Sequence, residues 1–192
     1  MQGDRAVAGL TPPAGPRLET GRLILRPLEP QDFEPWAAFA GDEETMRHLG
    51  GVQRLPVAWR GFMTVAGAWA MQGCSMFSVI EKASGRWVGR LGPWVPAQWP
   101  GTEIGWGLAR EVWGRGYATE GATAAIDWAF DTLGWSEVVH CIAPANAASL
   151  NVARRLGSSF LRQARLPAPY DAEEVEIWGQ TREVWRARRG PP

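Results

Sequence analysis

One stretch constrains the fold more than any other, because a strand-like run, a glycine-rich turn and a helical run follow one another directly. The strand-like run is EIGWGLAR, the turn is WGRGYAT, and the helical pattern continues to about Leu133. The first amides of a helix have no partner within the helix and carry partial positive charge. Glycine also lets a ligand approach the backbone closely. The turn therefore predicts an anion site or, as the alternative, a tight turn with a solvated arginine.

The apolar patterns on either side of this unit follow a definite order along the chain. They predict a strand, two helices, three strands, a helix, a strand, a helix and two strands, without internal repeats. In the second helix, Trp59, Ala66 and Trp69 fall on one predicted face. This order is typical of a mixed α/β fold. We expect one domain over residues 18–186, with a flexible N-terminal tail at 1–17 and a C-terminal tail at 187–192.

Composition excludes several classes of protein. The chain has 192 residues, of which 45% are hydrophobic and 21% charged, so extensive disorder is not expected. Its 20 basic and 20 acidic residues balance, which argues against a general nucleic-acid binder. Cys74, Cys141, His48 and His140 show no metal-ligand spacing, so no metal is predicted. We expect a cytoplasmic protein with no membrane segment, because no apolar run approaches ~20 residues and no disulfide framework is present.

Two common phosphate-binding loops do not fit the turn. A P-loop requires a lysine followed by Ser or Thr, and the turn contains no lysine. The dinucleotide fingerprint requires a third glycine where Thr119 stands, and Gly121 comes two residues late. A nucleotide-dependent kinase is thus the weakest of the enzyme hypotheses, since a metal-ligand pair is also missing from the sequence.

The strand and turn, together with APANAASLNVARRLG, resemble the GNAT superfamily of acetyl-CoA-dependent N-acetyltransferases. The opening LETGRLILRPLEPQDFEPW and the closing EIWGQTREVW are similar to its RimJ/RimL-like branch, so the resemblance covers residues 18–185. It implies a mixed, mostly antiparallel central sheet of six or seven strands, with a splayed central strand pair and about four flanking helices. It also implies that acetyl-CoA is the cosubstrate, with pantetheine lying in the splay.

The resemblance assigns the pyrophosphate to backbone amides of the turn. The residues implied in cofactor binding are Leu108, Ala109, Arg110, Arg115, Gly116, Tyr117, Ala118, Thr119 and Asn146. Alanines of the following helix form a small-residue stripe that allows close packing on the sheet. The chain departs from the family pattern at Trp113, where the loop usually has Gln or Arg. A side-chain cation must then come from Arg115 or Arg110.

Glu103 is the candidate general base. It shares one predicted strand face with Gly105 and Gly107, which leaves room for a ligand, and the resembled enzymes often place a glutamate here. Partial burial would raise its pKa toward a useful value. The structural alternative is a strand-end glutamate paired with an arginine. Whether Glu103 acts directly or through a water molecule stays open.

The resemblance offers fewer candidates for the leaving thiolate and the oxyanion. The tyrosine that many relatives use is replaced by Ala153, so Ser149 is the implied partner of the sulfur. Ser149 and Asn146 could equally cap their helix, and both roles can hold together. A backbone N–H near Leu108, at a bulge in the strand, is implied as the oxyanion donor. Family members usually attack directly, and neither cysteine has a local signature of a nucleophile.

The acceptor is an amine that the sequence does not identify. The resemblance implies a peptide N-terminal α-amine or a small-molecule amine, with no nucleic acid and no membrane as partner. Its groove would be lined by the first two helices and by the loop GPWVPAQWPG. A homodimer through the exposed-looking final strand is one option. The alternative to an enzyme is a module of the same fold that binds or senses acyl-CoA without catalysis.

Overall fold

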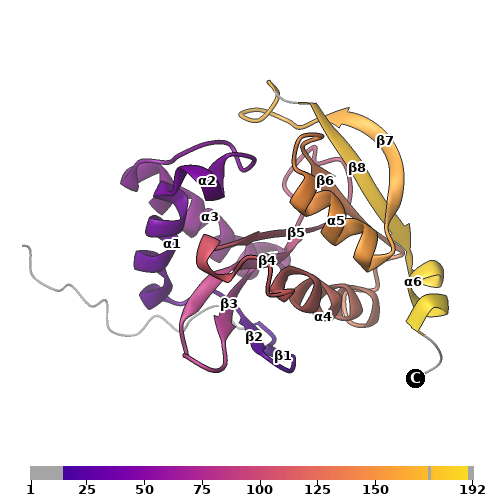
Figure 1. Cartoon of the computed structure of the whole chain (residues 1–192), viewed down its shortest axis with the longest axis horizontal. Coiled ribbons are helices and arrows are strands. Elements are labelled where there is room, and N and C mark those ends of the chain that lie inside the picture. The colour runs from indigo at the N-terminus through magenta and orange to yellow at the C-terminus, as the bar shows by residue number, and fades with distance from the viewer. Residues whose placement is uncertain (1–14, 173, 190–192) are drawn as a thin grey trace, which may run out of the picture.

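A single eight-stranded sheet organises the computed structural model, which describes residues 15–172 and 174–189 (Figure 1). The strand order is β1-β2-β3-β4-β5-β6-β8-β7, and every neighbouring pair is antiparallel except β5 with β6. The strands are β1 (Leu18–Glu19), β2 (Leu23–Arg26), β3 (Phe77–Glu81), β4 (Trp87–Trp94), β5 (Glu103–Leu108), β6 (Glu137–Ile142), β7 (Ser159–Arg165) and β8 (Glu174–Thr181).

Helices cover both faces of this sheet. One face carries α1 (Phe33–Gly41), α2 (Glu43–Met46) and α3 (Leu55–Gln72), whose buried side chains pack on β3 and β4. The other carries α4 (Tyr117–Asp131), α5 (Ala147–Leu156) and α6 (Arg182–Arg189). Two short 3-10 turns, Pro30–Asp32 and Arg110–Val112, precede α1 and α4. Figure 1 shows α1 to α3 gathered at one side, away from α4, α5 and α6.

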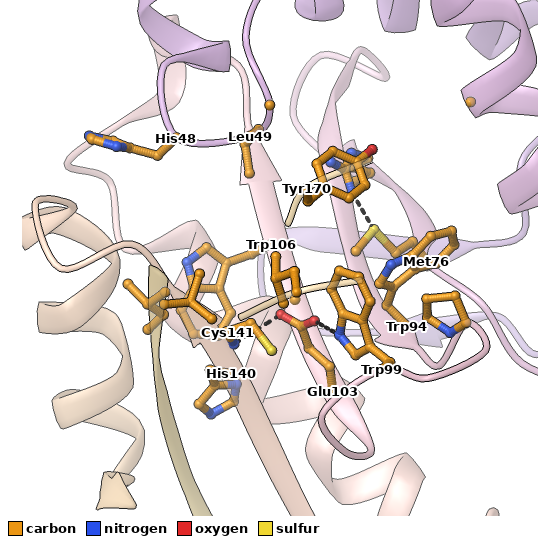
Figure 2. A pocket seen from close by; sticks show the side chains of 18 of the residues that line it. His48, Leu49, Met76, Trp94, Trp99, Glu103, Trp106, His140, Cys141 and Tyr170 are labelled. Carbon is orange, nitrogen blue, oxygen red and sulfur yellow. Dashed lines mark hydrogen bonds between the residues drawn. The ribbon is translucent and has the colours of Figure 1, made fainter. Parts of the chain in front are cut away.

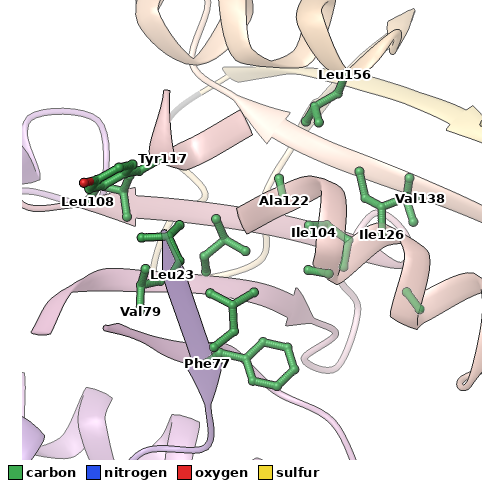
Figure 3. Packing of buried hydrophobic residues seen from close by; sticks show 14 of the residues in the cluster. Leu23, Phe77, Val79, Ile104, Leu108, Tyr117, Ala122, Ile126, Val138 and Leu156 are labelled. Atoms are coloured by element: carbon green, nitrogen blue, oxygen red, sulfur yellow. The ribbon is translucent and has the colours of Figure 1, made fainter. Parts of the chain in front are cut away.

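The largest hydrophobic cluster lies beneath α4 (Figure 3). Ala122, Ala125 and Ala129 are fully buried there, so the predicted alanine stripe is the face that meets the sheet. A side chain at Gly121 would bring its Cβ to 3.1 Å from Leu91 Cδ1. The small residues therefore let α4 lie close to the sheet, which fixes the position of the turn that precedes the helix.

The two neighbours of β5 are paired with it very differently. On the β4 side six residue pairs follow in unbroken register, from Gly89–Leu108 to Trp94–Glu103. On the β6 side only Glu103 and Val139 are paired. The two parallel strands meet at their beginnings and then separate. This confirms the splayed central pair that the resemblance implied.

The fold class is confirmed, with more elements than predicted. Strand β1 and helix α2 are too short to show a periodic pattern of apolar residues. Helix α6 forms where the sequence predicts the end of the last strand. Helix α6 continues to Arg189, past the predicted boundary at 186. The tail at 1–17 lies outside the described residues except for 15–17.

Two details of the predicted arrangement are wrong. Trp59 is 51% exposed, because the buried face of α3 starts one residue earlier, at Ala58. The final strand, β8, is not at an edge, since it lies between β6 and β7. The exposed edge strand is β7.

Candidate functional site

His140 fills the beginning of the gap between β5 and β6. Its imidazole is buried, with Nδ1 2.7 Å from the carbonyl oxygen of Ile104 and Nε2 3.1 Å from Ser158 Oγ. A carbonyl can only accept, so Nδ1 carries the proton and Nε2 accepts from the serine hydroxyl. Burial lowers the pKa of His140 to about 4, and the bond to Ile104 opposes that shift. The neutral His140 ring thus satisfies the Ile104 carbonyl, which has no backbone partner on β6 because the two strands separate here.

Glu103 stands at the last paired position, where the gap opens. Its side chain is 6% exposed, and its carboxylate accepts hydrogen bonds from the Trp99 indole and, at 3.2 Å, from the Cys141 backbone N–H. Burial raises the pKa of Glu103 to about 7, against the lowering effect of these donors and of the more distant charge of Arg90. No arginine or lysine of the described residues forms a salt bridge with it. The predicted alternative of a glutamate paired with an arginine is therefore wrong for the described part of the chain.

The Glu103 carboxylate lines a pocket of about 410 Å³, whose other walls come from the helices on both faces of the sheet. Its walls include Trp36 and Thr64 from the α1–α3 side, and Asn146 and Ser149 from the start of α5. Figure 2 shows the Glu103 carboxylate at the centre of this pocket, between Trp99 and Cys141. The structure thus brings together Glu103, Asn146 and Ser149, which are far apart in the sequence.

Glu103, Gly105 and Gly107 do share one strand face, but that face is only partly open. A Cβ at Gly107 would lie 2.9 Å from the Phe39 ring and 3.1 Å from Leu49, so side chains of the α1–α2 region fill the space there. At Gly105 the nearest atoms are Met76 Cε and Glu103 Oε1. The room for a ligand therefore lies at the Glu103 end of the strand.

Ser149 and Asn146 are tied to the splay through their own hydrogen bonds. Asn146 caps α5, since its side-chain oxygen accepts from the Ser149 backbone N–H at 3.0 Å. Ser149 Oγ lies 3.2 Å from Trp106 Nε1, which must donate because indole nitrogen has no lone pair to offer. The serine hydroxyl keeps its own proton for another acceptor. Ala153, one turn later, is buried in a small cluster with Leu150.

The turn before α4 has the geometry of an anion cradle. Gly116 caps the helix with φ +80°, a conformation that favours glycine. The backbone N–H groups of residues 115–119 donate to no acceptor among the described residues. Thr119 Oγ1 is buried and likewise has no hydrogen-bond partner among them. Five successive amides and a hydroxyl without partners in the described part of the chain therefore lie at the start of α4, which fits the donor that the resemblance implies.

The two predicted cations are engaged with carboxylates. Arg115 lies 3.3 Å from Glu81, and Arg110 lies 3.8 Å from Asp42, although both guanidinium groups remain more than half exposed. Arg22, which no sequence pattern indicated, donates to the Arg115 carbonyl at 2.9 Å. Its guanidinium also lies 4.6 Å from the Tyr117 ring centroid and pairs with the Glu120 carboxylate at 2.6 Å, so Arg22 is likewise a paired cation beside the turn.

The end of β5 differs from the expectation in one respect. The pairing of β5 with β4 is unbroken through Leu108, and the bulge instead lies between β3 and β4, at Val79–Ile80. The alternation of the ladder still directs the N–H of Leu108 toward the splay, because Ala109 N–H bonds to β4. The Leu108 carbonyl accepts from Trp113 Nε1 at 2.7 Å. Trp113 thus braces the strand end that leads into the turn.

The cysteines offer no nucleophile. Cys141 lines the pocket beside Glu103, and burial together with the neighbouring carboxylate raises the pKa of its thiol. Burial also raises the pKa of Cys74. Both thiols are therefore protonated at neutral pH. Within the described residues no three His, Cys, Asp or Glu side chains are grouped to hold a metal ion.

Sequence reasoning missed three side chains that shape the pocket, Arg90, His140 and Tyr170. Trp99 bonds to Glu103 and packs edge-on against Tyr170, with ring centroids 6.5 Å apart. His140 holds the splay, and Arg90 enters the pocket from β4. None of these carries a local motif, because each role depends on contacts between distant segments. Only the tryptophans of the 92–101 loop were suggested by composition.

Comparisons with known proteins agree with this geometry. The family model described as "Acetyltransferase (GNAT) domain" matches residues 22–159, a span that contains the splay, the turn and α5. The FsC-acetyl coenzyme A-N(2)-transacetylase of Aspergillus fumigatus is 30% identical over 95% of this chain and 83% of its own length.

Solved structures show the same fold. The crystal structure of an acetyltransferase from Agrobacterium tumefaciens matches with a TM-score of 0.77 and 31% identity, over 88% of this chain and 96% of that one. Mycobacterium smegmatis RimJ in complex with CoA-disulfide matches with a TM-score of 0.64 over 84% and 82%, and at 18% identity it shows the fold alone. No helix in the described ranges is long and apolar enough to cross a bilayer. The chain belongs to the GNAT family of acetyltransferases.

Proposed function

We propose that this protein moves an acetyl group from acetyl-CoA directly to a primary amine, bound together with the donor. The acceptor is a protein N-terminal α-amine or the amine of a small molecule. One observation carries the proposal: a buried carboxylate, Glu103, stands where the open strand gap meets a pocket large enough for a small acceptor. The name of the Aspergillus relative, which includes acetyl coenzyme A, supports the choice of donor.

Glu103 takes the proton that the attacking ammonium must lose. A general base works best when its pKa lies near the working pH, and burial brings the pKa of this carboxyl to about 7. The Trp99 and Cys141 donors hold the carboxylate in one orientation. The same site can pass the proton through one water molecule, and neither route requires Glu103 to move.

The open edge of β5 and the start of α5 would contact the donor and its leaving sulfur. The Leu108 N–H faces the open side of β5, but the length of the strand places it about 16 Å from Glu103, so we assign it to the pantetheine arm of the donor and not to the oxyanion. Ser149 keeps a free hydroxyl proton for the departing thiolate, because its oxygen already accepts from Trp106. Asn146 positions Ser149 by capping α5, and it also lines the pocket.

The turn at 115–119 holds the phosphates of the donor. The free amides and the Thr119 hydroxyl favour an anion at this point, whereas Arg22 and Arg115 are already paired with Glu120 and Glu81. Between the strand gap and this turn, the donor would contact Leu108, Ala109 and Arg110. The CoA-disulfide bound by the Mycobacterium relative is consistent with the assignment.

The test of the chemistry is Glu103→Gln in an assay of thiol release with acetyl-CoA and a panel of amines. The variant should lower kcat/KM by roughly 10²- to 10⁴-fold, with acetyl-CoA affinity unchanged. Wild-type kcat/KM should rise with pH through about 7, as Glu103 loses its proton. Glu34→Gln, an exposed change on α1, is the control. An unchanged rate in Glu103→Gln would remove this carboxylate from the mechanism.

The cradle is tested with Thr119→Val, which keeps the shape of the side chain and removes its hydroxyl. Affinity for CoA should fall about tenfold, because a hydrogen bond to a charged group is lost. Thr123→Val, one turn further along α4, is the matched control, since that hydroxyl bonds to the Thr119 carbonyl at 2.8 Å. Equal CoA affinities in both variants, measured by calorimetry, would contradict the assignment.

We further propose a cytoplasmic location, which the two free cysteines, Cys74 and Cys141, support. A homodimer, if formed, would use β7, whose residues are almost all exposed at the edge of the sheet.

A further inference from the structure

The pocket beside Glu103 has a second charged group that the proposed chemistry does not use. Among the described residues that line it, Arg90 is the one lysine or arginine. Its guanidinium is partly buried and lies over the Trp36 ring at 5.5 Å and the Phe39 ring at 6.0 Å. Arginine stays protonated in proteins, so the pocket contains a fixed positive charge.

Within the described residues, the partners of this charge are weak ones. The single hydrogen-bond acceptor of Arg90 is the thioether sulfur of Met76, and no carboxylate lies within 4.0 Å. Arg26 on the neighbouring strand shows the contrast, because its two nitrogens clamp Asp32 at 2.7 and 2.8 Å. A guanidinium fork offers five donors and matches a planar carboxylate. Arg90 is therefore built to receive an anion that these parts of the chain do not supply.

The strand register places this cation on the same face as the general base. Arg90 is opposite Gly107 and Trp94 is opposite Glu103, with Gly92 opposite Gly105 between them. The Arg90 guanidinium lies over the Trp36 and Phe39 rings on this face and donates to the Met76 sulfur. Met76 contacts Arg90 and also lies 3.0 Å from a Cβ at Gly105, beside Glu103. In Figure 2 Met76 and Tyr170 lie on the same side of the Glu103 carboxylate.

The remaining walls of this part of the pocket are largely apolar and aromatic. They come from helix α1, from the 92–101 loop and from the loop before β8, and include Trp36, Trp94, Trp99 and Tyr170. Such walls pack against a hydrophobic or aromatic body. The pocket therefore presents a base at one end, a cation further along and apolar surface between and around them.

We propose that the acceptor is a small amino acid with an apolar or aromatic side chain, whose carboxylate binds Arg90 while its amine faces Glu103. This inference rests on the proposed function and selects the small-molecule acceptor over a peptide N-terminus. In the step, the amine nitrogen forms a bond to the acetyl carbon and the carbon–sulfur bond breaks. The nitrogen loses two protons: the first goes to Glu103 before attack, and the second replaces the proton that the Ser149 hydroxyl gives to the departing sulfur, which leaves as the thiol of CoA. The carboxylate is bound but unchanged.

The experiment compares acceptors that differ only in the carboxylate. L-phenylalanine, L-phenylalaninamide and 2-phenylethylamine are tested with acetyl-CoA, together with a peptide that begins with alanine. Wild-type protein should show a KM for L-phenylalanine at least tenfold below that for either analogue without the carboxylate. We compare KM and the Kd measured in the presence of CoA, because the three amines differ in basicity. Equal values for the amino acid and the two analogues without the carboxylate would overturn the inference.

Arg90→Met removes the charge and keeps an unbranched side chain, and Arg90→Lys keeps the charge without the fork. Arg90→Met should raise KM for L-phenylalanine about 10- to 100-fold and leave KM for 2-phenylethylamine unchanged. Arg90→Lys should keep part of the preference for L-phenylalanine over 2-phenylethylamine that Arg90→Met loses. If Arg90→Met weakens all acceptors equally, the arginine is structural and the inference is wrong.

The two proposals fail in distinguishable ways. Acetyl transfer without a preference for the carboxylate contradicts only the role of Arg90. A wild-type KM for the alanine peptide at or below that for L-phenylalanine does the same, because the inference selects a free amino acid over a peptide N-terminus. Absence of thiol release with every amine, while CoA binding persists, contradicts the transferase assignment itself and the inference that depends on it.

Discussion

Strand β5 has one closed edge and one open edge, and each contributes differently to the site. Its six pairs with β4 make a rigid platform that carries Glu103 at one end and Leu108 at the other. Its single pair with β6 leaves backbone groups that the sheet does not use. The closed edge therefore fixes positions, and the open edge provides donors, acceptors and space. A site that needs both is built by ending one parallel pairing early.

The largest effect is expected on the closed edge. Gly89 has φ +152°, and a Cβ there would lie 2.5 Å from the Gly107 carbonyl oxygen, which is backbone and cannot move aside. Gly89→Ala should lower the free energy of unfolding by about 4 kcal/mol. Gly85→Ala, in the hairpin turn with φ +68° and open space, should cost only about 1 kcal/mol. Equal losses in urea titrations would mean that the ladder is not tightly closed.

Glu103 links the two edges, and its ionisation should weaken the fold. Its pKa is about 7 in the folded protein and about 4.5 when unfolded, so the folded state holds its proton longer. The contribution of Glu103 to stability then falls as pH rises from 4.5 through 7, by up to about 3 kcal/mol, and is measured as the difference between wild type and Glu103→Gln. Glu103→Gln should lack this fall in melting temperature, whereas Glu34→Gln should retain it. Parallel curves for wild type and Glu103→Gln would contradict the burial of the charge.

The open edge of β5 is tested by removing the His140 imidazole, which bonds across the gap to the Ile104 carbonyl. His140→Phe leaves the Ile104 carbonyl without its partner and should destabilise the protein by about 2 kcal/mol at pH 7.5. Burial holds the pKa of His140 near 4, below its ordinary 6.5, so the stability that this ring contributes is lost as pH falls from 6.5 to 4, in opposition to the gain from Glu103. The variant should lose less over that range. A variant as stable as wild type would show that the ring is not needed to hold the gap.

The smallest effect separates two roles of Asn146. Asn146→Ala removes the cap of α5 and should cost about 1 kcal/mol, whereas Asn146→Asp keeps a capping oxygen and the stability. If the side-chain amide also contacts pantetheine, both variants should bind CoA more weakly. If only Asn146→Ala does so, the residue acts through its cap alone. Thermal melts and calorimetry distinguish these outcomes.

The parts of the molecule that sequence predicted well are those specified by nearby residues. The turn, the alanine face of α4 and the Asn146 cap follow from local spacing and caps, and Gly157 ends α5 with φ +85°. The parts missed depend on distant segments. The bridge from His140 to Ile104 and the bond from Trp99 to Glu103 arise only when the strands are placed side by side. The location of the bulge was also not predictable, because either of two adjacent strand pairs could hold it.

The walls of the acceptor side come from segments outside the strand–turn–helix unit. They lie on helices α1 and α3, on the segment between α2 and α3, on the loop after β4 and on the loop before β8, while the cradle follows β5 directly. Substitutions in those walls can accumulate during evolution without disturbing the donor side. A gene duplicate could therefore acquire a new amine as substrate through changes in these helices and loops, and keep the same chemistry.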